Sequence, residues 1–198
     1  MNISGVILAG GANKRFNGVT KAMVVIDGKT IISRAIDTIK DLFNEIIIVT
    51  NTPEEFKEFK NCKLVSDHFQ KAGPLGGIHA ALTTASGEAV FVFAGDMPLL
   101  NKDLILRQIA YFKNCKSDVL VPRINQNIEP LHAIYGVGIR IFLEDYLTKE
   151  NDYAVRKFLK LVNVGFLQLE DSEVNKSAFT NINTPSDILR VRTILEIM

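Results

Sequence analysis

The apolar residues of this chain form short uninterrupted runs, and between the runs they recur every three or four positions. Runs without polar alternation predict strands that are buried on both faces of a sheet. The strands predicted in this way cover residues 6–9, 45–50, 63–66, 88–94, 118–124 and 164–169. Residues 131–135 are predicted to pair as a further strand after a polar turn around Gln126 and Asn127.

The segments with helical spacing lie between these runs. They cover residues 30–43, 52–61, 73–85, 102–113, 137–148 and 153–161, and a last helix begins at Thr184. Strand and helix alternate at least four times within the first 124 residues, which predicts a mostly parallel sheet with helices on both faces. The predicted fold class is therefore α/β, as one three-layer α/β/α domain over residues 1–198.

Composition excludes several classes of protein. Of the 198 residues, 47% are hydrophobic and 23% are charged, which is typical of a globular domain. A net charge of +1 creates no global field for nucleic acid or an anionic membrane, so any anion site must be local. Cys62 and Cys115 form no Cys-x-x-Cys pair, which predicts reduced cysteines and a cytoplasmic protein. No apolar run reaches the ~18 residues of a membrane span, and we expect no signal peptide.

The loop that leaves the first strand combines glycines with fixed positive charge. Gly10 and Gly11 follow the strand directly, and Arg15 and Lys21 come later in the same loop. Glycines at a strand end allow positive φ and bring backbone N–H groups close to a ligand. The pattern favours a polyphosphate, but it has neither the Walker spacing nor a G-x-G-x-x-G motif. The alternative is a tight turn with solvated basic side chains.

Three further strands end in polar side chains. Asn51 and Asp67 follow the second and third strands, and Asp96 follows the fourth. Because ligands bind outside the carboxyl ends of parallel strands, we expect these side chains to gather at one edge with the loop. Asp96 offers the hard oxygen ligand that Mg²⁺ takes beside phosphates. Each of the three could instead be a turn residue or a helix cap.

Several motifs follow one another in a fixed order along the chain. They are Leu8-Ala9-Gly10-Gly11, Arg15 with Lys21, Gly73-Pro74-Leu75-Gly76-Gly77, Gly95-Asp96-Met97-Pro98 and Asn181-Ile182-Asn183-Thr184-Pro185. In this set the chain resembles the molybdenum cofactor guanylyltransferase family of MobA-like nucleotidyltransferases, from about residue 5 to residue 190. The resemblance implies a Rossmann-like fold of the nucleotide-diphospho-sugar transferase type.

The resemblance also implies a role for each residue of the site. The residues implied to bind the nucleotide, its metal or the acceptor are Leu8, Ala9, Gly10, Gly11, Lys21, Asn51, Asp67, Asp96, Asn181 and Asn183. The first strand end would contact the guanine nucleotide, and Asn51 and Asp67 would line the guanosine pocket. The two asparagines near the end of the chain would face molybdopterin. A cap formed by Thr184 and Asp187 is the alternative for that last segment.

The resemblance implies an enzyme that transfers GMP from GTP to the terminal phosphate of molybdopterin and releases pyrophosphate. The implied catalytic residues are Arg15 and Lys21, which would stabilise the leaving group, and Asp96, which would hold Mg²⁺. The implied partners are GTP and molybdopterin, with no nucleic acid and no membrane. The resemblance further implies transient contact with enzymes that insert or accept the molybdenum cofactor.

Alternatives to this function stay open at the level of sequence. Another nucleotidyltransferase of the same fold, of the cytidylyl or sugar-phosphate type, would show a similar pattern. A glycosyltransferase would usually show Asp-x-Asp, but Asp96 has no second carboxylate beside it. A non-catalytic nucleotide-binding protein would lose the carboxylate or Lys21. The chain departs from the usual family pattern at Phe16, Asn17 and Gly95.

Overall fold

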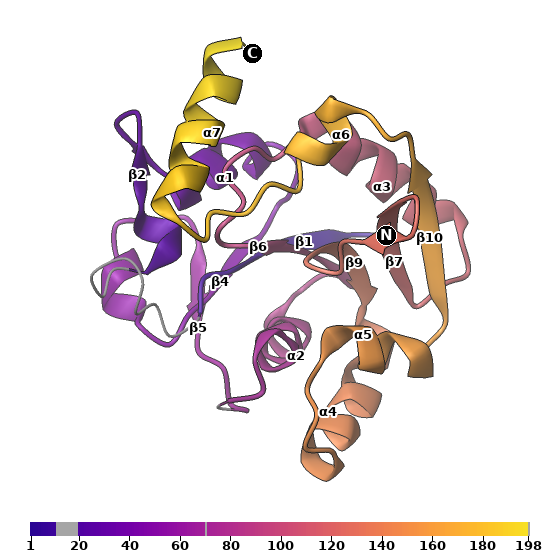
Figure 1. The fold of residues 1–198 in the computed structure, drawn as a ribbon. Coiled ribbons are helices and arrows are strands. Elements are labelled where there is room, and N and C mark those ends of the chain that lie inside the picture. Colours follow the sequence, from indigo (N-terminus) through magenta and orange to yellow (C-terminus); the bar gives the residue numbers. More distant parts are fainter. Residues whose placement is uncertain (11–19, 70, 198) are drawn as a thin grey trace.

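The structure, a computed structural model, describes residues 1–10, 20–69 and 71–197. Across these residues an eight-stranded sheet runs in the order β10-β7-β9-β6-β1-β4-β5, with β8 paired to β7 (Figure 1). The strands are β1 (Ile3–Leu8), β4 (Ile46–Val49), β5 (Lys63–Val65), β6 (Ala89–Ala94), β7 (Val119–Ile124), β8 (Asn127–Ile128), β9 (His132–Gly136) and β10 (Val164–Leu169). Only β8 and β9 run antiparallel to their neighbours in this sheet. The predicted mostly parallel sheet is confirmed.

Helices cover both faces of the sheet, which confirms the three-layer α/β/α arrangement. Figure 1 shows α1 and α3 on one face, with α6 and α7 beyond them, and α2, α4 and α5 on the other face. The helices are α1 (Ile31–Ile39), α2 (Pro74–Thr84), α3 (Lys102–Asn114), α4 (Arg140–Lys149), α5 (Val155–Phe158), α6 (Glu173–Ser177) and α7 (Pro185–Ile197). Within the described part of the chain, no helix is both long and apolar enough to cross a bilayer.

Strand β6 shows why the central strands read as continuous apolar runs. Every one of its residues is buried. Phe91 and Phe93 point to the face covered by α1 and α3, and their rings stack with centroids 4.4 Å apart. Val90 and Val92 point into the second core, under α2 and α4. Since successive side chains alternate between the two faces, a strand between two cores needs apolar residues at every position.

The segment that follows β4 is shorter than its sequence predicts. Residues 52–61 carry the signals of a capped α-helix, but the structure has a 3₁₀ turn over Pro53–Phe56. The Thr52 side chain makes no capping hydrogen bond, and the backbone N–H of Glu55 donates to the Thr52 carbonyl at 3.1 Å. The helix prediction is wrong in type and length, because a proline after a threonine starts either kind of helix and the buried Phe56 ends the turn early.

A hairpin and a short helix were not expected from the pattern. Strands β2 (Val25–Ile26) and β3 (Lys29–Thr30) pair across Asp27 and Gly28, whose φ angles are 47° and 77°. Positive φ at both central residues is the geometry of a type I′ turn, which an Asp-Gly pair favours. Helix α6 has five residues and leads into the segment that carries Asn181 and Asn183.

His132 belongs to the core. Its side chain is fully buried on β9, and its ring meets those of Phe91, Phe93 and Phe179 edge to face at centroid distances of 5.1–5.3 Å. Burial lowers the pKa of the imidazole from 6.5 to about 4. The neutral ring therefore packs as an aromatic side chain at neutral pH.

We expect His132→Phe to make the fold less sensitive to acid. The unfolded chain takes up a proton near pH 6.5, whereas the folded chain does so only near pH 4, so stability is lost as the pH falls through this interval. At pH 5 the loss amounts to about 2 kcal/mol. Urea unfolding of the wild type and of His132→Phe at pH 7.5 and pH 5 measures this loss of stability. An equal loss in the variant would show that another group causes the pH dependence.

Candidate nucleotide-binding site

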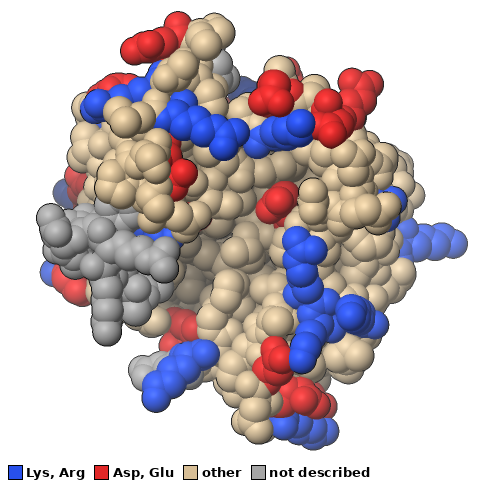
Figure 2. All heavy atoms as spheres, viewed as in Figure 1, with Lys and Arg blue, Asp and Glu red and all other residues tan. Residues whose placement is uncertain are grey.

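A pocket of about 920 Å³ opens at the carboxyl ends of β1, β4, β5 and β6. The expected site residues that line it are Leu8, Ala9, Gly10, Lys21, Asn51, Asp67 and Asp96. Figure 2 shows a hollow in this face of the molecule. Uncharged residues form its floor, and basic and acidic side chains surround it. Residues from four strand ends thus meet at one edge of the sheet, as the parallel arrangement requires. Gly11 and Arg15 lie outside the described residues, so their roles stay predictions.

The ends of β1 and β6 approach each other closely at Gly95. Its backbone N–H donates to the Leu8 carbonyl at 2.9 Å. A Cβ atom at this position would lie 2.7 Å from the same carbonyl oxygen and 3.1 Å from the Cα of Ala9. Position 95 of this chain therefore requires glycine, and the close approach places Asp96 next to Leu8 and Ala9 at the end of β1.

Asp67 is held over helix α2 at the far side of the pocket. Its Oδ1 accepts the backbone N–H of Phe69 at 2.7 Å, and its own N–H donates to Asn51 Oδ1 at 3.2 Å. The carboxylate lies against Gly76, where a Cβ would come within 2.4 Å of Oδ2. Burial raises the pKa of this carboxyl group. Asp67 thus forms a turn, as one alternative held, and its side chain also faces the pocket.

We expect Gly76→Ala to disturb Asp67 rather than helix α2. The added methyl group overlaps the carboxylate, and overpacking of this kind costs about 1–3 kcal/mol. Thermal unfolding measures the cost, with Gly138→Ala as a control because a Cβ there meets open space. In an Asp67→Ala background, Gly76→Ala should become nearly neutral. Additive effects of the two substitutions would contradict the contact.

The Lys21 ammonium brings distant parts of the chain together. Nζ donates to Asp96 Oδ2 at 3.2 Å and to Asn183 Oδ1 at 2.6 Å. The Lys21 and Asp96 side chains are 24% and 21% exposed, so this ion pair is partly shielded from solvent. The segment of Asn183 also pairs through its backbone, since the N–H of Ile182 donates to the Asp96 carbonyl at 2.9 Å. Lys21, Asp96 and Asn183 therefore form one cluster.

The capping alternative for the last motif is also confirmed. Asp187 Oδ2 accepts the backbone N–H groups of Asn183 and Thr184 at 2.8 and 2.7 Å, and the Thr184 hydroxyl at 2.9 Å. This cap starts α7 and at the same time fixes the backbone of Asn183. Neither the half-buried Asn181 nor the exposed Asn183 is among the residues that line the pocket. The structure thus joins one of the two asparagines to the cluster.

The residues present fit a magnesium ion bound together with phosphates. Asp96 faces the pocket with a carboxylate, and Mg²⁺ needs few protein oxygens when phosphates and water supply the rest. No group of three or more His, Cys, Asp or Glu side chains that could hold a metal occurs in residues 1–10, 20–69 and 71–197. A site with a single carboxylate therefore depends on the ligand for most of its metal contacts.

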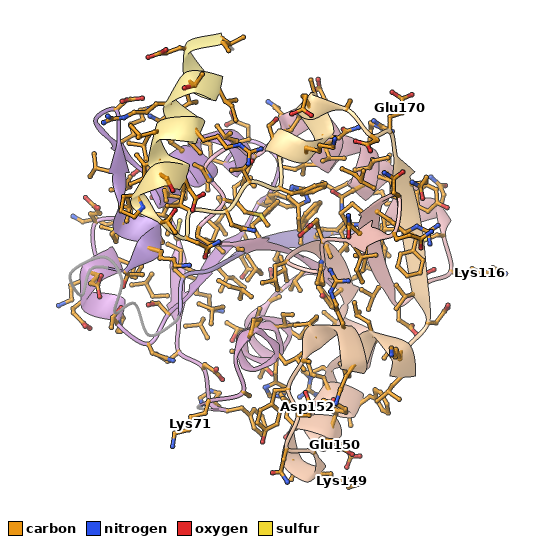
Figure 3. All side chains as sticks on the ribbon, in the orientation of Figure 1. Lys71, Lys116, Lys149, Glu150, Asp152 and Glu170 are labelled. Atoms are coloured by element: carbon orange, nitrogen blue, oxygen red, sulfur yellow. The ribbon has the colours of Figure 1, made fainter. Side chains whose placement is uncertain are left out.

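Several residues of the pocket were not singled out from the sequence. They are Thr20, Ala22, Val49, Thr50, Thr52, Lys71, Ala94 and Leu131. Figure 3 shows Lys71 extending outward from the loop before α2, at the margin of the molecule. Lys71 has φ 75°, an uncommon value for a side-chain-bearing residue. No local pattern marks these residues, because they reach the pocket through the packing of neighbouring strand ends.

Known proteins resemble this chain over nearly its full length. The sequence pattern of the MobA-like NTP transferase domain matches residues 5–170. A "Probable molybdenum cofactor guanylyltransferase" of Natranaerobius thermophilus is 38% identical over 98% of this chain and 97% of its own length. A molybdenum cofactor guanylyltransferase of Desulfosudis oleivorans is 34% identical over 94% of this chain and 92% of its own length.

A solved structure supports the fold independently. Molybdopterin-guanine dinucleotide biosynthesis protein A from Archaeoglobus fulgidus superposes with a TM-score of 0.81, covering 98% of this chain and all of the other. The two sequences are 24% identical, so this likeness speaks for the fold alone. The sequence match over most of the chain and the identity to the curated relatives go further, and they show that this enzyme belongs to the MobA-like NTP transferase family.

Proposed function

We propose that the protein transfers GMP from GTP to the terminal phosphate of molybdopterin and releases pyrophosphate. The relatives at 34–38% identity carry the name of this activity. The single observation that best supports the proposal is the contact of Lys21 with both Asp96 and Asn183. This contact joins the expected nucleotide half of the site to the expected acceptor half. The new phosphate bond must form where the two halves meet.

The guanosine half of the site lies over β4 and β5. Guanine presents an N–H and an amino group side by side on its pairing edge, and a carboxylate can accept both hydrogen bonds. Asp67 is held at this side of the pocket by Asn51 and Phe69, so it is the residue we expect to read the base. Adenine lacks that pair of donors, and binding of GTP should therefore exceed binding of ATP.

The phosphate half includes Gly10 at the end of β1, Lys21 and Asp96, which all line the pocket. The acceptor phosphate is already ionised at neutral pH, so the protein needs no general base and acts by positioning and charge stabilisation. Lys21 and Arg15 are assigned to the growing charge on the leaving pyrophosphate, and the backbone N–H groups that start at Gly10 to the same phosphates. Asp96 is assigned to hold Mg²⁺, which when bound neutralises charge between the phosphates.

The acceptor half lies beside the start of α7. Asn181 and Asn183 carry amide groups that can both donate and accept, as the polar atoms of a pterin require. We place the reaction in the cytoplasm, because Cys62 and Cys115 are both free, as a reducing compartment allows. Enzymes that insert or accept the finished cofactor are the proposed transient partners.

Thermal shift and product analysis test this function together. With Mg²⁺ present, GTP at a hundred times its dissociation constant should raise the stability by about 2.7 kcal/mol. ATP, CTP and UTP at the same concentration should give smaller shifts. Incubation with GTP and molybdopterin should then release pyrophosphate, and omission of molybdopterin should abolish the release. A larger shift with CTP would favour a cytidylyltransferase of the same fold.

We expect Asn181→Ala to weaken the acceptor and to leave the nucleotide unaffected. Among the described residues, the Asn181 side chain makes no hydrogen bond to the Lys21 cluster. Removal of the Asn181 amide should raise KM for molybdopterin about tenfold, which corresponds to a loss of about 1.4 kcal/mol in binding free energy. Steady-state kinetics with each substrate varied in turn measures the effect, with the exposed Asn61→Ala as control. An equal rise in both KM values would refute the division into two halves.

A further inference from the structure

The Lys21 side chain occupies groups that both substrates need. Its ammonium donates to Asp96, the residue assigned to the metal and the nucleotide, at 3.2 Å. The same ammonium donates to Asn183, assigned to the acceptor, at 2.6 Å. While both contacts last, the Lys21 ammonium therefore occupies the Asp96 carboxylate in one half of the site and the Asn183 amide oxygen in the other.

The metal and the ammonium compete for one carboxylate. Mg²⁺ binds carboxylate oxygens directly, and Lys21 already uses Oδ2 of Asp96. Because both side chains are less than a quarter exposed, solvent screens the repulsion between the two cations only weakly. A metal held by Asp96 would therefore repel the ammonium, and phosphates bound with the metal would attract it.

The backbone of Asn183 does not depend on Lys21. Its N–H donates to Asp187 Oδ2 at 2.8 Å, and the neighbouring Ile182 donates to the Asp96 carbonyl at 2.9 Å. When the ammonium leaves, the Asn183 side chain loses one contact but its backbone keeps its place. The amide oxygen is then exposed in position for another hydrogen-bond donor.

We propose that Lys21 is an exchangeable bridge that sets the order of substrate binding. The metal and the nucleotide displace it from Asp96, and its departure frees Asn183 for the acceptor. This inference rests on the nucleotidyl transfer proposed above, and it adds that the nucleotide must bind first. It also assigns Lys21 two successive sets of partners, the carboxylate and amide before GTP binds and the phosphates afterwards.

Metal binding without nucleotide tests the first step. Lys21→Met removes the competing cation, so the variant should bind Mn²⁺ about tenfold more tightly than the wild type, as measured by the electron paramagnetic resonance of free Mn²⁺. Lys29→Met should leave the affinity unchanged, because Lys29 pairs with the exposed Asp37 at 2.9 Å. Circular dichroism checks that both variants fold. Equal affinity in the wild type and Lys21→Met, or no detectable binding by either, would overturn the proposal.

The side-chain amide of Asn183 reports the second step. In ¹⁵N-labelled wild-type protein, Mg²⁺ with a non-hydrolysable GTP analogue should shift this signal, which the Asn183→Ala spectrum identifies. In Lys21→Met the signal should start away from its wild-type position and respond little. If the backbone signal of Gly95 shifts but that of Asn183 stays, Lys21 keeps its partner and the bridge is refuted. If neither signal shifts, the proposed nucleotide site fails, while the Mn²⁺ experiment still tests the bridge.

Discussion

Asp96→Asn is expected to lower kcat for GMP transfer ~10²-fold or more, the loss typical of removing a main electrostatic stabiliser. A neutral amide can still accept a hydrogen bond, but it binds Mg²⁺ poorly. The fold should survive, because the contact that holds the neighbouring segment uses the Asp96 carbonyl, which accepts the N–H of Ile182 at 2.9 Å. Loss of the partly exposed ion pair with Lys21 should cost no more than ~1 kcal/mol.

Two measurements on one preparation separate catalysis from stability. Pyrophosphate release gives kcat, and thermal unfolding gives the change in stability. Asp37→Asn is the matched control, since Asp37 is also a carboxylate paired with lysine, at 2.9 Å, but on the exposed side of α1. The control should keep nearly full activity. If Asp96→Asn retains more than about a tenth of the wild-type rate, Asp96 does not hold the metal.

Lys21→Ala is expected to lower kcat/KM for GTP ~10²-fold or more. An ammonium about 4 Å from a phosphate charge gains roughly 4 kcal/mol at an effective dielectric constant near 20, before desolvation. Much of this gain should appear in the transition state, when charge moves onto the departing pyrophosphate. Lys21→Arg should restore only part of the activity, because a planar guanidinium does not replace a compact ammonium.

The control for this prediction is Lys29→Ala. Lys29 lies in the β2–β3 hairpin, is 58% exposed and pairs with Asp37 at 2.9 Å, so it resembles Lys21 in chemistry but not in place. Steady-state kinetics of both variants, with GTP varied, should give a large loss for Lys21→Ala and almost none for Lys29→Ala. Similar values for the two would mean that the β1 loop is only a turn and that Lys21 does not contact the triphosphate.

The expected effects of Lys21 removal run in opposite directions for binding of the bare metal and for turnover. Without Lys21, Asp96 should bind the metal more tightly, but the enzyme should work more slowly. A residue that served only to hold the fold would not separate the two measurements in this way. The pair of results therefore distinguishes a functional lysine from a structural one.

The sequence by itself determined the central layer of this protein and the place of its site. Uninterrupted apolar runs predict strands between two cores, and β6 with its alternating Phe91 and Val92 shows the reason. Because parallel strands end at one edge, polar residues directly after the runs could be assigned to one site without knowledge of contacts. Asn51, Asp67 and Asp96 all line the pocket for this reason.

Some local signals in the sequence were ambiguous. The threonine and proline at the start of residues 52–61 suit an α-helix and a 3₁₀ turn equally, and the burial of Phe56 selects the turn. The cap that Asp187 forms with Thr184 could be predicted from the sequence. It explains where α7 starts, but it does not predict the contact of Asn183 with Lys21.

Only the tertiary structure decided the contacts between distant segments. Asn183 meets Lys21 across 162 positions, and no periodicity or spacing carries information over that distance. The need for glycine at position 76 comes from the Asp67 carboxylate above it, and the need at position 95 comes from the Leu8 carbonyl. The place of His132 in the core comes from the three phenylalanine rings that pack around it. In each case the deciding atoms belong to another element, whose position depends on the packing of the whole sheet.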